Sequence, residues 1–176
     1  MALSIGDRML GALRLQDAAY EDIEADEKAT GEAAFIIVAT SLVSGAVNGV
    51  LTGAGGGFFG ALGSLIGWAF YAWVAYLVGV KLFPGPLTKS SWGELARTLG
   101  YANTARFFIV FELIPGLAAL TRTIVALWVL VATVVALRAA LDITTARAIW
   151  IAIASALAQL FIIAVALTAA ARLIPS

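Results

Sequence analysis

The chain has 176 residues, of which 62% are hydrophobic and 12% are charged, and its mean hydropathy is +0.99. An average soluble domain is about 45–50% apolar and about 25% charged, and so short a chain cannot bury this excess in one core. The composition therefore predicts a membrane protein. The zero net charge argues against a nucleic-acid-binding protein, and the absence of Cys and His removes thiolate chemistry and the commonest general base.

Residues 1–32 form the first predicted unit, a cytoplasmic amphipathic segment rich in acidic residues. Leu10, Leu13, Tyr20 and Ile23 fall near one helical face. We therefore expect a helix along the membrane surface that joins the first span near Gly31. A helix that binds anionic lipid carries Lys and Arg instead, so the acidic face is either a solvated surface or a docking site for a basic protein surface. The predicted docking residues are Glu21, Asp22, Glu24 and Asp26.

Residues 33–176 form the second predicted unit, an all-α polytopic membrane bundle. About 20 apolar residues cross a bilayer, and five runs fit or approach that length. They are residues 33–52, 58–80, 104–120, 122–141 and 147–172. The third run contains Arg106, Glu112 and the Pro115-Gly116 pair, so we expect a kinked span there. A re-entrant segment is the alternative, and it would reverse the side of every later residue.

Glycines recur at a spacing of four around the first two runs. These predicted helix-packing residues are Gly45, Gly49, Gly53, Gly57, Gly63 and Gly67. Small residues four apart form a flat stripe that allows a second helix to approach closely, so we expect these two spans to pack tightly through a short hairpin at residues 53–57. The sequence GGGFFG at residues 55–60 also fits the dinucleotide-binding pattern G-x-G-x-x-G. No strand precedes it and the next acidic residue is Glu94, which disfavours nucleotide binding.

A second polar segment, residues 83–108, follows the second run. Two prolines around Gly85 break the chain there. Ser91 and Glu94 have the S-x-x-E spacing of a capping box, which predicts a short helix beginning at Ser91. Trp92, Leu95 and Leu99 would share one face of it.

Basic residues predict the orientation, because Lys and Arg concentrate on the cytoplasmic side. With a cytoplasmic N-terminus and five spans, the outer segments hold only Arg122 and Arg172, and the inner segments hold nine basic residues. The C-terminus then lies outside, in what we expect to be a bacterial cytoplasmic membrane. No signal peptide is visible before the first run.

Three polar residues fall inside the predicted spans, namely Glu112, Gln159 and Asn48. An ionisable group at such depth indicates function by default, so Glu112 could serve a proton or substrate pathway with Gln159 and Arg106. Alternatively, Glu112 could bond to Gln159 or to the backbone loosened by Pro115 and stabilise the kink. No catalytic residues, metal ligands or cofactor-binding residues are predicted.

Three stretches resemble bacterial members of the Yip family over nearly the whole chain. They are AYEDIEADEKATGEAA at 19–34, ELARTLGYANTARFF at 94–108, and the run from LIPGLAAL to VALRAALD that ends at Asp142. The resemblance implies five-span membrane proteins whose eukaryotic relatives interact with Rab GTPases in the early secretory pathway. Ala105 stands where members often have proline, and the eukaryotic DLYGP signature is absent, so Rab binding is not implied.

Three functions are consistent with the sequence. The first is a non-enzymatic scaffold or adaptor that binds other membrane proteins or shapes the bilayer, with membrane lipids and protein subunits as partners. The second is a small-molecule, proton or lipid transporter that uses Glu112. The third is an enzyme, and no active-site pattern supports it. The broken third run favours transport, but the matched broken helices of transporters are absent. The acidic segment and the family resemblance favour the adaptor.

Overall fold

A computed structural model describes residues 3–53, 57–86 and 88–173, and within these ranges the chain is helical with no β-strand. Two short helices, α1 (Ile5–Leu13) and α2 (Asp17–Ala25), come first. The long helices are α3 (Ala29–Thr52), α4 (Gly57–Tyr76), α6 (Ala118–Leu141) and α7 (Thr145–Leu173). A π-helix η1 (Leu77–Leu82) extends α4, and α5 (Trp92–Ala102) continues as a 3₁₀-helix η2 (Asn103–Leu113). The predicted all-α class is confirmed.

Four helical segments within the described ranges are long and apolar enough to cross a membrane. They are Ala29–Thr52, Leu62–Leu82, Ala118–Leu141 and Thr145–Val165. Each contains most of one predicted apolar run. The predicted third run, residues 104–120, is not among them. Its helix ends at Leu113, and α6 begins at Ala118.

The prediction of one kinked helix over 104–120 is therefore wrong. Ile114 has an extended backbone (φ −78°, ψ 121°), which is the conformation that a following proline favours. Gly116 has φ 84°, a value that glycine adopts without steric cost. The Pro115-Gly116 pair thus forms a turn between η2 and α6 instead of a kink inside a span.

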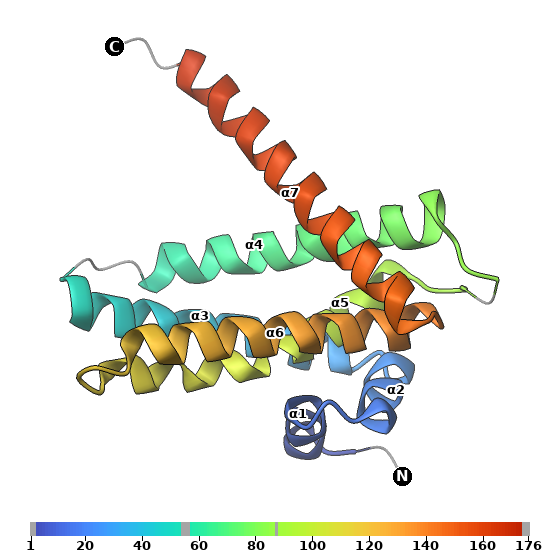
Figure 1. Cartoon of the computed structure of the whole chain (residues 1–176), viewed down its shortest axis with the longest axis horizontal. Coiled ribbons are helices and arrows are strands. Elements are labelled where there is room, and N and C mark those ends of the chain that lie inside the picture. The colour runs from blue at the N-terminus through green and yellow to red at the C-terminus, as the bar shows by residue number, and fades with distance from the viewer. Residues whose placement is uncertain (1–2, 54–56, 87, 174–176) are drawn as a thin grey trace.

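The long elements lie side by side (Figure 1). η2 packs against both α3 and α6, and α4 packs against α3. The start of α5, the end of α6 and the start of α7 lie at one end of the molecule, together with α1 and α2. The turn after η2, the end of α3 and the start of α4 lie at the other end. α7 diverges from the bundle, and Leu157, Leu160 and Phe161 in its outer half are more than 60% exposed.

The predicted single amphipathic helix is instead two helices. Leu15 has φ 57°, so the chain turns sharply between α1 and α2. Both helices pack on α5, and α2 also packs on α6. Gly31 lies inside α3, which begins at Ala29. The apolar face predicted at Tyr20 and Ile23 is fully buried against protein.

The Ser91–Glu94 capping box is present, with the Ser91 hydroxyl accepting from the Glu94 N–H and the Glu94 carboxylate accepting from the Ser91 N–H. One very close helix approach is at a glycine that we did not single out for packing. A Cβ on Gly100 of α5 would lie 2.5 Å from the Ala33 Cβ of α3.

The predicted glycine stripe differs from the structure at three positions. A Cβ on Gly53, Gly63 or Gly67 would meet no other atom within 4 Å in the described part of the chain. Gly53 instead ends α3 with φ 71°, its N–H bonded to the Gly49 carbonyl. Residues 54–56 of the predicted hairpin lie outside the described ranges.

Candidate functional site

Arg8 is the most deeply buried charged residue that the structure describes, with 1% of its surface exposed. Its Nε donates to Asp22 at 2.7 Å, its two terminal nitrogens donate to Asp26 at 2.7 Å and to Glu32 at 3.0 Å. We call these four side chains the Arg8 clasp. The planar guanidinium suits this arrangement, because its five N–H groups can reach several carboxylates in fixed directions. The clasp ties α1 to α2 and to the start of α3.

Electrostatics favour the ionised clasp. The hydrogen bond from Arg8, followed by the backbone N–H of Lys28, holds the pKa of Asp26 below its ordinary value of 3.8. Burial by itself lowers the pKa of Arg8, but the hydrogen bonds to Asp26, Asp22 and Glu32 outweigh burial and raise it. Tyr101 of α5 donates its hydroxyl to Glu32. The clasp is thereby joined to the helix beneath it.

Arg97 makes a second connection from α5. Its Nε donates to the Ile23 carbonyl at 3.2 Å, and a terminal nitrogen donates to the Glu24 carbonyl. These carbonyls belong to the last turn of α2, where four carbonyls have no partner within the helix. Arg97 therefore satisfies the end of α2 and fixes it on α5. α6 adds Trp128, whose indole N–H donates to the Leu13 carbonyl at 3.1 Å.

A surface hollow of about 380 Å³ lies beside Arg97. It is lined by Glu21, Glu24, Ala25, Glu27, Lys89, Glu94 and Arg97. Burial, reinforced by the nearby charges of Asp142 and Glu94, raises the pKa of Glu24 to about 7. Four carboxylates and two basic side chains leave this acidic hollow with net negative charge above that pH. α1, α2, the start of α3 and the acidic hollow together are called the N-terminal platform below.

The four predicted docking residues therefore separate into two pairs. Asp22 and Asp26 point inward to Arg8. Glu21 and Glu24 line the acidic hollow, and Glu21 is exposed. The sequence analysis placed them on one acidic face because it did not recognise the turn at Leu15 that brings Arg8 of α1 against α2.

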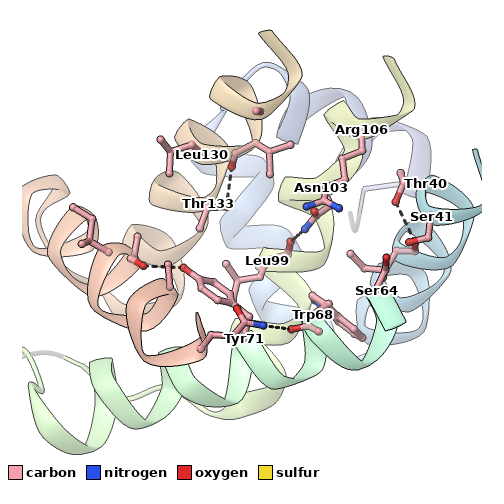
Figure 2. Close-up of a pocket in the computed structure, with 18 of the residues that line it drawn as sticks. Thr40, Ser41, Ser64, Trp68, Tyr71, Leu99, Asn103, Arg106, Leu130 and Thr133 are labelled. Atoms are coloured by element: carbon pink, nitrogen blue, oxygen red, sulfur yellow. Dashed lines mark hydrogen bonds between the residues drawn. The ribbon is translucent and has the colours of Figure 1, made fainter. Parts of the chain in front are cut away.

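A larger cavity of about 590 Å³ lies within the bundle (Figure 2). Five segments line it, namely α3, α4, the α5–η2 helix, α6 and α7. Arg106 brings a charge to the lining, Asn103 and Gln159 bring amides, Ser, Thr and Tyr residues bring hydroxyl groups, and none of the described lining residues is acidic. The Asn103 amide donates to the Leu99 carbonyl at 2.8 Å, and the Gln159 amide donates to the Gly67 carbonyl at 3.1 Å. The Arg106 side chain extends toward Asn103 (Figure 2).

Glu112 does not line this cavity. It is 3% exposed, and its two carboxylate oxygens accept from Arg122 at 3.2 and 2.7 Å across the Pro115-Gly116 turn. The structure brings Gln159 and Arg106 together around one cavity and leaves Glu112 in a separate ion pair. Asn48 lies on an exposed face of α3, and its carbonyl accepts from Thr52.

Many of the residues that carry the family resemblance gather around the N-terminal platform. Tyr20, Ile23, Leu95, Tyr101 and Leu141 are all fully buried there. A family model described as the Yip1 domain matches residues 10–167. The chain belongs to the Yip1 family. No curated protein and no solved structure matches the chain.

Three arginines of this Yip1-family chain were missed as structural residues, and each left some signal in the sequence. Arg8 and Asp22 lie on adjoining short helices with opposite charge. Arg97 falls inside the ELARTLGYANTARFF stretch of the Yip resemblance. Arg122 follows Glu112 by ten residues across a Pro-Gly pair, so a tight turn there brings the two together. The sequence predicts these pairings only if the turns at Leu15 and Pro115 are recognised first.

Proposed function

We propose that this Yip1-family membrane protein is a non-enzymatic adaptor that uses the exposed side of α2 to dock a basic surface of another membrane protein. The observation that supports this function is the division of the acidic residues. Asp22, Asp26 and Glu32 are used internally, by Arg8. Glu21 and Glu27 are exposed at the acidic hollow.

A folded platform favours specific recognition. The Arg8 clasp and the Arg97 contacts fix α2 before a partner arrives, so little conformational entropy is lost on binding. Complementary charge then steers the partner and fixes its orientation. The carboxylates of Glu21 and Glu27 make no hydrogen bond or ion pair within the described ranges, so their charges remain available to a partner.

We further propose that the α5–η2 helix crosses the membrane as the third of five spans. An α-helix rises about 1.5 Å per residue and a 3₁₀-helix about 2.0 Å. The eleven residues of α5 and the eleven of η2 thus cover about 38 Å, which exceeds the hydrocarbon thickness of about 30 Å. The 3₁₀ geometry makes the eleven residues of η2 longer than the same residues would be in an α-helix.

This topology places the N-terminal platform in the cytoplasm and the C-terminus outside, in a bacterial cytoplasmic membrane, as the basic residues predict. Reporter fusions after Lys89, Thr121, Asp142 and Ser176 should read in, out, in and out. A cytoplasmic signal at Ser176 would instead indicate a re-entrant third segment.

Charge reversal tests the adaptor function and separates docking from folding. Glu21→Lys with Glu27→Lys should abolish co-purification of a stoichiometric partner from native membranes and leave the melting temperature of the protein unchanged. Asp7→Lys is the matched control, because Asp7 is exposed on α1 away from the acidic hollow. Equal partner recovery with the Glu21/Glu27 double variant and with the parent would reject the docking surface.

Transport through Glu112 has less support. Its carboxylate is held by two hydrogen bonds from Arg122 and lies outside the lining of the cavity. We therefore assign Glu112 to the stability of the η2–α6 turn.

A further inference from the structure

The cavity of Figure 2 contains a positive charge without a protein partner. Arg106 lines it, and the guanidinium makes no hydrogen bond or ion pair with any residue that the structure describes. The lining positions of α3, α4, α6 and α7 all fall inside the membrane-crossing segments. A cation at this depth is costly, and in membrane proteins such residues pair or mark a ligand pathway. Arg106 is an exposed residue, so its unpaired charge is open to an anionic ligand that enters the cavity.

The rest of the lining adds hydrogen-bonding groups and no competing charge. The Asn103 and Gln159 amides each use one N–H within the protein, and each has a second N–H to offer. No Asp or Glu among the described residues lines the cavity. The site is therefore suited to a group with a single negative charge and several acceptor oxygens, and it repels a cation.

The cavity rim indicates where this group comes from. α6 contributes Leu130 and α7 contributes Ile153 and Leu157, which are 55%, 44% and 62% exposed. α7 diverges from the bundle beyond these positions (Figure 1). An apolar opening between two membrane helices faces acyl chains, whereas a water-soluble ion enters through a polar mouth.

We propose that this cavity binds an anionic phospholipid, with the phosphate at Arg106 and the acyl chains passing out between α6 and α7. Along α6, the lining runs from Ala126 to Thr133, five to twelve residues from Arg138, which corresponds to about 8–18 Å. The headgroup is thus held deeper in the bundle than Arg138 at the end of α6. A zwitterionic lipid fits less well, because its ammonium group finds no carboxylate in the cavity.

Ligand-dependent melting of the full chain in a neutral detergent tests this proposal. Dioleoylphosphatidylglycerol should raise the melting temperature of the parent by about 5 °C at concentrations well above its dissociation constant. Dioleoylphosphatidylcholine should give less than half of that rise, and inorganic phosphate should give none. An equal rise with inorganic phosphate would identify a free anion as the ligand, and an equal rise with phosphatidylcholine would remove the requirement for net charge. Either result would overturn the proposal.

Variants connect the effect to the cavity. Arg106→Gln should lose the rise with phosphatidylglycerol, and its lipid-free melting temperature should not fall, because it removes an unpaired cation. Arg14→Gln, which removes an exposed charge at the end of α1, should behave like the parent. Ala156→Leu fills the cavity from α7 without changing its charge, and it too should lose the rise. If Arg106→Gln does not fold, Ala156→Leu decides the question. A full rise in either folded variant would contradict the proposal.

Discussion

Replacing Arg8 with methionine removes the charge at the centre of the clasp and keeps much of the side-chain length. The change breaks three charge-assisted hydrogen bonds of 2.7, 2.7 and 3.0 Å. Removing one partner of a buried ion pair typically costs about 3–5 kcal/mol. The side chains of Asp22, Asp26 and Glu32 are 24%, 28% and 29% exposed, so water can partly solvate them. We therefore expect a cost at the lower limit, about 3 kcal/mol.

The loss should be confined to the N-terminal platform. Hydrogen exchange of the α1 and α2 amides should accelerate in Arg8→Met, whereas exchange in α6 should change little. The clasp lowers the pKa of Asp26, so its stabilisation is fully present above about pH 4 and is lost as the pH falls through the lowered pKa. The difference in stability between the parent and Arg8→Met should become smaller over the same pH range. A cost below about 1 kcal/mol at neutral pH, or equal acceleration in the control Arg14→Met, would refute the reasoning.

Three further predictions follow from unequal burial and close approach. Arg122→Gln should lower the melting temperature more than Glu112→Gln, because the glutamate side chain is 2% exposed and its partner is 67% exposed; equal effects would contradict the buried-carboxylate argument. Gly100→Ala should destabilise by about 1–3 kcal/mol, because its Cβ would meet Ala33 at 2.5 Å, while Gly63→Ala, which meets open space, should melt at or above the parent temperature. Glu24→Gln should stabilise the protein at pH 8 and have little effect at pH 4.5. The raised pKa means that the parent loses stability as the pH rises from about 4.5 to about 7, and a pH-independent difference in melting temperature would exclude this titration.

The membrane helices were predictable from composition and run length. The four segments that can cross a membrane each contain most of a charge-free or nearly charge-free run. The third segment was not predictable in detail, because the Pro115-Gly116 pair fits both a kink and a turn. The φ of 84° at Gly116 and the Glu112–Arg122 pair select the turn.

The candidate site was predictable only in part. The acidic residues of the N-terminal unit were recognised. Sequence spacing could not show which of them bind Arg8 and which face solvent. That division depends on the turn at Leu15, where a non-glycine residue adopts φ 57°. The glycine spacing likewise indicated close packing, yet Gly100, which lies outside that spacing, makes a very close helix contact. Spacing along one helix shows where small residues lie, and it does not show which helix faces them.

Photo-crosslinking in native membranes tests the adaptor function most directly. A photoreactive residue at position 27 reports on the acidic hollow just beyond the end of α2, and one at position 160 reports on an exposed position of α7. The adaptor function predicts one discrete protein adduct from position 27, which Glu21→Lys abolishes and Asp7→Lys preserves. Protein adducts from position 160 alone, or an adduct from position 27 that Glu21→Lys does not reduce, would contradict docking through the acidic hollow.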